Sequence, residues 1–143
     1  MITNSKPALI QGSHHTDQRG TLSFVNDFDM ADVKRFYIIQ NADLKITRGW
    51  RAHRIERRWF YVSDGAFRIR IVKIDNWENP DKHLPVEEFI LSADQDQVLS
   101  IPVGYGSSIQ AISEKSKLIV FADYGIENAT KDDFLYPQDY FEA

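Results

Sequence analysis

The chain has 143 residues, 43% of them hydrophobic and 27% charged, which is the composition of a globular domain with a buried core and excludes a disordered or fibrous chain. Its net charge of −4 provides no global positive field, so nucleic acid is not an expected partner, although a local cluster of cations can still bind a small anion. Because there is no cysteine, disulfides, thiolate nucleophiles and cysteine metal sites are all excluded.

The first six residues lack the apolar core of a signal peptide, and no apolar run along the chain has the length needed to span a bilayer. No lipidation motif is present either. We therefore expect a cytoplasmic protein that has no membrane partner.

Short runs rich in β-branched and aromatic residues alternate with turn residues, which favours an all-β sandwich or barrel over alternating β-α-β units. The predicted strands cover residues 21–24, 33–40, 45–50, 58–62, 66–73, 87–91, 98–101, 108–112 and 117–122. Residues 63–65 are predicted to join two of these strands as a hairpin, and polar residues and prolines interrupt the chain over 76–85. Helix is expected to be scarce.

The predicted strand 66–73 alternates between two kinds of residue. Alternate residues from Phe67 to Ile71 are apolar, whereas Arg68 and Arg70 lie on the opposite face. We expect the apolar face in the core and the two arginines facing water or a ligand.

The densest group of residues with functional chemistry lies between Arg48 and Tyr61, where six residues are arginine or histidine. Alternate residues of an extended chain share a face, so Arg51 and His53 are expected to point the same way. A cationic face beside aromatic rings suits a diphosphate and a sugar or base, because arginine binds phosphate through paired hydrogen bonds and rings provide stacking area. The alternative is a solvated face of a sheet.

Residues spaced along most of the chain resemble the two motifs of the cupin family. They are Gly49, Arg51, His53, Gly65, Pro102 and Gly104. Five short segments also resemble, in order, the cupin-type dTDP-sugar 3,4-ketoisomerase (WxcM-like) family, and more distantly dTDP-4-dehydrorhamnose 3,5-epimerase. These segments are residues 17–22, 34–38, 48–53, 122–124 and 139–141.

The resemblance implies an all-β fold, a double-stranded β-helix (cupin, jelly-roll) in a single domain over residues 1–143. An N-terminal strand is expected to extend from the domain. The acidic and aromatic tail over 131–143 is expected to wrap its surface. Nothing in the sequence indicates a repeat, a linker or a second domain.

Metal-binding cupins place two histidines and a glutamate on the first motif and a histidine on the second, a set that suits iron, manganese or zinc. By the resemblance, those four places here hold Arg51, His53, Arg57 and Ser107. Two of the replacements are cations that repel a metal ion, so we expect no metal and no other cofactor. Glu56 lies one residue out of register and restores at most one ligand.

Relatives that move protons beside a sugar ketone have a histidine, their usual base, at the place of Arg51. A guanidinium hardly ever deprotonates, so Arg51 can bind or polarise a carbonyl but does not remove a proton. His53 is then the candidate base, and Tyr37, which the resemblance places in the pocket, is a candidate proton donor. The alternatives are a barrel histidine bonded to a neighbour and a tyrosine that anchors the core with its ring.

Four further residues are candidates for substrate binding. Arg19 lies in a segment that, in the epimerase relatives, crosses to a partner subunit and contacts the nucleotide diphosphate; its alternative is an arginine in a turn. Arg48 and Arg57 are the other candidates for the diphosphate. Tyr105, on the second motif, is expected to line the mouth of the barrel, although its glycine neighbours can equally form a turn.

The resemblance implies a metal-free isomerase or epimerase of a dTDP-linked 4-keto-6-deoxyhexose in deoxysugar or polysaccharide biosynthesis, with a dTDP-sugar as ligand and a homodimer as the assembly. Because the usual base is replaced, the alternative is a catalytically inactive cupin that binds a sugar nucleotide or regulates a partner. A third interpretation is a structural partner in polysaccharide assembly. Solvent-deuterium exchange at the sugar distinguishes the enzyme from the binding protein.

Overall fold

The computed structural model describes residues 6–141 and is built almost entirely from antiparallel strands. The strands are β1 (Ala8–Gln11), β2 (Ser13–Asp17), β3 (Gly20–Phe24), β4 (Arg35–Ile39), β5 (Thr47–His53), β6 (Arg58–Asp64), β7 (Ala66–Lys73), β8 (Glu87–Ser92), β9 (Gln97–Ile101), β10 (Tyr105–Ala111), β11 (Lys117–Ala122) and β12 (Phe134–Leu135). Two short 3-10 helices, η1 (Ala93–Gln95) and η2 (Ile126–Asp132), are the only helices in this range. The first five residues, most of the stretch judged to lack a signal peptide, and the last two residues of the tail lie outside it.

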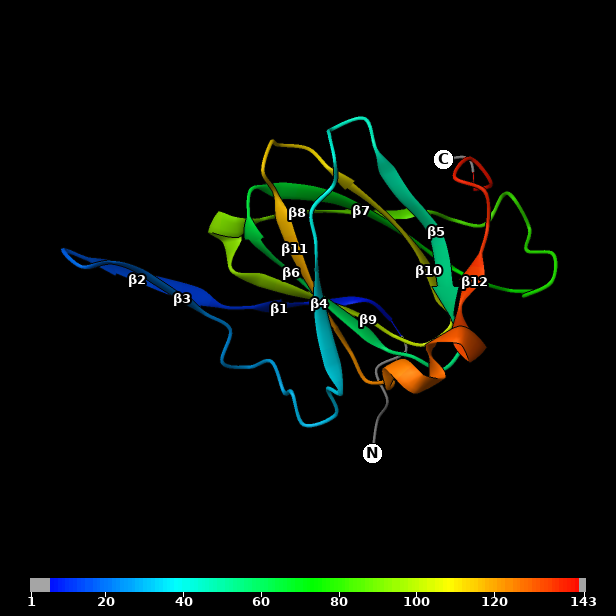
Figure 1. Cartoon of the computed structure of the whole chain (residues 1–143), viewed down its shortest axis with the longest axis horizontal. Helices are drawn as coiled ribbons and strands as arrows, with labels where there is room; N and C mark the ends of the chain where they lie inside the picture. Colours follow the sequence, from blue (N-terminus) through cyan, green and yellow to red (C-terminus); the bar gives the residue numbers. More distant parts are fainter. Residues whose placement is uncertain (1–5, 142–143) are drawn as a thin grey trace.

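Two five-stranded sheets form the body of the molecule, in the orders β1-β9-β6-β11-β4 and β12-β5-β10-β7-β8. The hairpin of β2 and β3 forms a separate two-stranded sheet that projects away from the body (Figure 1). This architecture confirms the predicted all-β class. Among residues 6–141, no helix has the length and apolar character needed to cross a membrane.

All nine predicted strands are present, and the predictions for β7 and β11 match their observed bounds. Strand β5 runs on to His53, three residues beyond its predicted end. Strand β10 begins at Tyr105, directly after a turn at Val103 and Gly104, so Tyr105 itself is in a strand and not in the turn. Strands β1, β2 and β12 were not predicted. They are short, and β2 is polar, so the apolar alternation that reveals a strand is missing there.

The hairpin predicted over residues 63–65 is wrong. The chain does turn there, with Gly65 at a φ of 71°, but β6 pairs with β9 and β11 whereas β7 pairs with β8 and β10. The turn therefore carries the chain from one sheet to the other at the edge of the barrel. The local signal of a tight turn is the same in both cases, and only the pairing partners of the two strands distinguish them.

The main core lies between the two sheets and contains residues from both. Its buried members are Phe60, Val62, Phe67, Ile69, Ile71, Leu91, Leu99, Ile101, Ile109, Ala111, Leu118 and Val120. The predicted alternation of β7 is confirmed, because Phe67, Ile69 and Ile71 face this core while Arg68 and Arg70 lie on the outer face and pair with Glu88.

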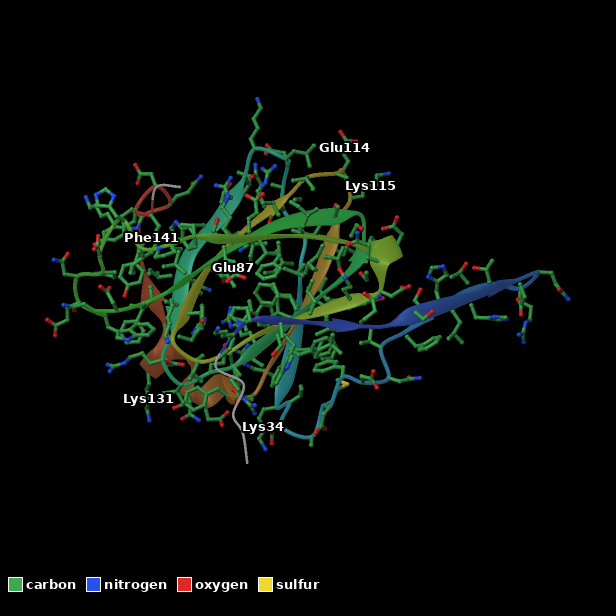
Figure 2. The ribbon with its side chains drawn as sticks, turned by 180° about the vertical axis from the view of Figure 1, so that it is seen from behind. Lys34, Glu87, Glu114, Lys115, Lys131 and Phe141 are labelled. Atoms are coloured by element: carbon green, nitrogen blue, oxygen red, sulfur yellow. The ribbon has the colours of Figure 1, made fainter. Side chains whose placement is uncertain are left out.

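A second apolar layer covers the outer face of the sheet that contains β5. There the C-terminal tail packs on Trp50, whose ring meets Phe141 edge to face at 5.1 Å and whose indole N–H donates to the carbonyl of Gln138 at 3.0 Å. Phe141 is labelled in Figure 2. Because Trp50 and Ala52 face this outer layer, the residues between and after them, Arg51 and His53, face the interior of the barrel.

Candidate active site

Two adjoining cavities open between the sheets at the side where β4 and β5 face each other. The larger has a volume of about 620 Å³ and the smaller about 230 Å³. Tyr37, Arg51 and Arg58 line both cavities and so form the boundary between them. Arg48 lines only the larger cavity, and His53 lines only the smaller one.

His53 is held by one ring nitrogen and unpaired at the other. Its Nδ1 lies 2.6 Å from the backbone carbonyl of Asp132, and since a carbonyl only accepts, Nδ1 carries the proton. The lone pair is therefore on Nε2, which is buried without a hydrogen-bond partner among the described residues. Burial, followed by the positive charge of Arg58, lowers the pKa of His53 below its ordinary value. The imidazole is thus neutral near pH 7, as a general base must be.

Asp132 positions this part of the site from the end of η2, next to Lys131, which is labelled in Figure 2. Its side chain is 1% exposed and accepts hydrogen bonds from the backbone N–H groups of Arg54, Ile55 and Glu56 at 2.7 to 3.1 Å. The same residue therefore fixes the imidazole through its carbonyl and the following turn through its carboxylate. Asp132 was not predicted as a site residue, because in the sequence it is one of several acidic residues in the tail.

Tyr37 reaches the cavities from β4, in the sheet opposite His53. The guanidinium groups of Arg35 and Arg58 lie 5.2 and 5.8 Å from the centre of its ring. Burial raises the pKa of the hydroxyl. The positive charges of nearby arginines act in the opposite direction, but the pKa remains raised, so Tyr37 is protonated at neutral pH. A protonated phenol can donate a hydrogen bond or a proton to a substrate oxygen.

A buried carboxylate, Glu56, joins the two arginines beside Tyr37. Arg58 Nε lies 2.5 Å from Glu56 Oε2, and Arg35 Nη2 lies 3.2 Å from Oε1. Glu56 is 3% exposed, and its Oε2 is 3.9 Å from His53 Nε2, beyond hydrogen-bond distance. Neither Arg35 nor Arg58 was a predicted site residue, and no local signal distinguishes them from the other arginines of the chain.

Arg51 and Arg48 complete the cationic lining. Arg51 is half-exposed, with its Nε 3.0 Å from Asp133 Oδ1, and Arg48 donates from Nε to Asn41 Oδ1 at 3.2 Å. The structure thus brings the predicted residues Tyr37, Arg48, Arg51 and His53 to one pair of cavities. Four arginines and two carboxylates line these cavities, which leaves an excess of two positive charges and favours an anionic ligand.

Three predicted binding residues lie elsewhere. Arg57 points outward, 2.8 Å from both Asp32 and Asp123, and lines neither cavity. Tyr105 lines a separate cavity of about 470 Å³ near the start of β8. Arg19 lies in the turn between β2 and β3, 85% exposed, and pairs with the aspartate two residues before it.

The residues at the four metal-ligand places do not fit a transition metal. Two are arginines and one is Ser107, so of the four only His53 provides a usual transition-metal ligand atom. Glu56, the neighbouring carboxylate, is engaged by two arginines instead. No group of three or more potential metal-ligating side chains is found between residues 6 and 141. The absence of a metal rests on this chemistry and stays a prediction.

Comparison with known proteins places the chain in a family. The family model FdtA, described as WxcM-like, C-terminal, matches residues 5–143. No curated protein matches the chain.

Solved structures show the same fold at low sequence identity. QdtA, a sugar 3,4-ketoisomerase from Thermoanaerobacterium thermosaccharolyticum in complex with TDP, is 23% identical, with 98% of this chain and 95% of that chain covered and a TM-score of 0.71. ChmJ, a 3'-monoepimerase from Streptomyces bikiniensis in complex with dTDP-quinovose, is 13% identical over 92% and 70% of the two chains, with a TM-score of 0.75. The rmlC epimerase of Mycobacterium tuberculosis is 12% identical over 93% and 70%, with a TM-score of 0.73.

These likenesses confirm the predicted cupin fold. The match of the family model over nearly the whole sequence confirms the predicted family as well: the chain belongs to the WxcM-like, C-terminal (FdtA) family.

Proposed function

We propose that the protein is an isomerase or epimerase of a dTDP-linked 4-keto-6-deoxyhexose, in deoxysugar or polysaccharide biosynthesis in the cytoplasm, and that it works without metal or other cofactor. One observation carries the proposal: the lone pair of His53 Nε2 is buried and unpaired in the wall of a cationic cavity. An unsatisfied buried polar atom costs about 1–3 kcal/mol, so its presence needs a reason. A role as general base is such a reason, because Nε2 then gains a partner only when the substrate presents its proton.

The chemistry follows from the positions of the residues. The ketone acidifies the neighbouring C–H, His53 Nε2 takes that proton, and the electron pair of the C–H bond moves onto the enolate oxygen. Nδ1 keeps its proton and its bond to Asp132 throughout, so the ring does not rotate. The proton then returns to a carbon of the sugar, and no oxidant or reductant is consumed.

Two residues are suited to the developing negative charge. Arg51 borders both cavities and provides a permanent cation for the enolate oxygen. Tyr37, protonated and on the opposite sheet, provides a proton donor from the other side of the substrate. The assignment of His53, Tyr37 and Arg51 as catalytic residues is therefore retained from the sequence.

The larger cavity suits the diphosphate and the nucleoside. Arg48 and Arg51 lie in its wall, and the excess positive charge of the site matches a diphosphate. QdtA was crystallised with TDP and ChmJ with dTDP-quinovose, which supports a nucleotide sugar as the ligand class. Arg58 replaces Arg57 in this assignment, because only Arg58 faces the cavities.

A homodimer is part of the proposal. The β2–β3 hairpin projects from the body, and Leu22 on it is 63% exposed, so this side chain is accessible to a partner subunit (Figure 1). In a dimer, Leu22 of the hairpin packs against the partner subunit, and Arg19 lies near the diphosphate that the partner binds. Light scattering at micromolar concentration tests the assembly, and a stable monomer of 16.6 kDa contradicts it.

The binding protein without turnover is a real second candidate. Arg51 occupies the place of the usual base, and His53 Nε2 is buried, so a substrate reaches it only if a neighbouring side chain shifts. If that shift does not occur, the cavities bind a sugar nucleotide and do no chemistry.

Deuterium exchange decides between the two. The protein is first tested for stabilisation by dTDP in a thermal-shift assay, then incubated with TDP-4-keto-6-deoxyglucose in D₂O, and the sugar is examined by NMR. We expect deuterium at a carbon next to the ketone, together with a rearranged or epimerised product. Binding without deuterium incorporation, for every nucleotide sugar that binds, replaces the enzyme with the binding protein.

A further inference from the structure

The carboxylate of Glu56 is buried beside the unpaired nitrogen of His53, and no step described so far uses it. We propose that Glu56 is a positioning residue for the base: its carboxylate accepts a hydrogen bond from the Nε2–H that forms when His53 takes the substrate proton. This inference rests on the proposed function, since it concerns the same base. The proton stays on Nε2 and is returned to the substrate, so Glu56 accepts a hydrogen bond and gains no proton of its own.

His53 and Glu56 are both held by hydrogen bonds to Asp132. Asp132 holds His53 at Nδ1 with its carbonyl and holds the backbone N–H of Glu56 at 2.8 Å with its carboxylate. Asp132 therefore holds both ends of the turn from His53 to Glu56, in which Nε2 and Oε2 lie 3.9 Å apart. A shift of about 1 Å turns this separation into a charge-assisted hydrogen bond, which is normally 2.7–2.9 Å long.

The two arginines hold the carboxylate of Glu56 in place. Arg58 Nε and Arg35 Nη2 contact different oxygens of the carboxylate, so its plane is fixed by partners from β4 and β6. A carboxylate buried to this extent is stable only with such pairing. The carboxylate charge next to Nε2 is therefore paired with two arginines and held in position.

His53 needs this charge because its other surroundings disfavour the imidazolium. The groups around it are Arg51 from β5, Tyr37 and Arg35 from β4, Arg58 from β6, Glu56 from the turn after β5, and Asp132 and Asp133 at and after the end of η2. On β10, Tyr105 is the residue that pairs with His53 across the two strands. Burial and Arg58 both lower the pKa of His53, whereas Glu56 and Asp132 raise it. Without Glu56 the imidazole is a weaker base, with no acceptor for its new proton.

The test is the titration of the His53 ring, followed by NMR in the free protein. His53→Asn identifies the signal among the four histidines of the chain. In Glu56→Gln, which keeps the shape but removes the charge, we expect the midpoint to fall by about one pH unit, a tenfold loss of proton affinity. Glu88→Gln is the matched control, because Glu88 also pairs with two arginines but lies on the outer face of β7 and β8; its midpoint is expected to equal that of the wild type.

Activity provides a second readout. In Glu56→Gln the acid limb of the kcat/KM profile for deuterium exchange is expected to move to lower pH with the midpoint, and the plateau to fall about tenfold because the base is weaker. Glu56→Asp keeps the charge at a greater distance and is expected to give a smaller downward shift. It also serves as the test variant if Glu56→Gln does not fold.

An unchanged or raised midpoint in a folded Glu56→Gln, or in Glu56→Asp if only that variant folds, overturns the proposal even when the wild type is an active enzyme. Failure of the proposed function looks different: the wild type then exchanges no deuterium with any nucleotide sugar. In that case the NMR midpoints still decide whether Glu56 controls the protonation of His53.

Discussion

The backbone carbonyl of Asp132 lies 2.6 Å from His53 Nδ1 and thereby leaves the basic lone pair on Nε2. This contact joins the last turn of η2 to the end of β5 and makes the C-terminal segment part of the candidate site. A histidine that was free to rotate would present either nitrogen to a substrate. Here only Nε2 carries a lone pair, and it is buried next to Glu56 and Arg58.

His53→Asn is expected to abolish deuterium exchange into the bound 4-keto sugar and to change binding by no more than several-fold. An amide of similar shape preserves contacts but does not take the proton. The measurement is NMR of the sugar in D₂O, with His83→Asn, an exposed histidine in a polar loop, as the control. Exchange that continues undiminished in His53→Asn makes His53 a structural residue.

Arg51→Ala is expected to weaken the binding of dTDP and to slow exchange by on the order of 100-fold, because it removes a cation from both the diphosphate and the enolate oxygen. Arg57→Ala is the matched control, since Arg57 pairs with two aspartates outside the cavities. Calorimetry with dTDP measures the binding. Equal losses in the two variants mean that the effect is one of net charge and not of the site.

Asp132→Ala is expected to lower the free energy of unfolding by roughly 2–4 kcal/mol, because three backbone N–H groups lose their shared acceptor. Urea unfolding followed by tryptophan fluorescence measures the change. Asp139→Ala removes an exposed aspartate of the same tail and is expected to have little effect. A similar stability in both variants contradicts the role given to Asp132.

The protein is expected to lose stability as the pH falls below the ordinary histidine pKa of 6.5. The pKa of His53 is lowered in the folded state, so at acid pH the unfolded chain binds a proton there more readily than the folded one, and unfolding is favoured. Urea unfolding at pH 7.5 and 5.5 measures the slope. In His53→Asn the slope is expected to be smaller, and an equal slope in both proteins refutes the assignment to His53.

Elemental analysis is expected to find far less than one equivalent of iron, manganese or zinc per chain after purification without added metal. The physical reason is the donor set, because arginines stand at two of the four places where a cupin metal would be bound. Exchange activity is accordingly expected to be unaffected by prolonged treatment with a chelator. About one equivalent of a transition metal in the purified protein overturns this prediction.

The sequence by itself determined nine of the twelve strands found in residues 6–141, and the region of the site. The alternation in β7 is a local property, since neighbouring side chains of an extended chain always point to opposite faces, and it correctly separated Phe67 from Arg68. The same rule placed Arg51 and His53 on one face, because both lie within β5.

Tertiary structure decided which neighbouring residues complete the site. Residues Arg57 and Arg58 are equivalent by composition, but the turn held by Asp132 sets the phase at which β6 begins, and Arg58 faces inward as a result. The turn at Gly65 likewise joins two sheets and not a hairpin, for reasons that lie in the distant pairing partners of β6 and β7. Such contacts join residues far apart along the chain, so no local pattern of side chains contains them.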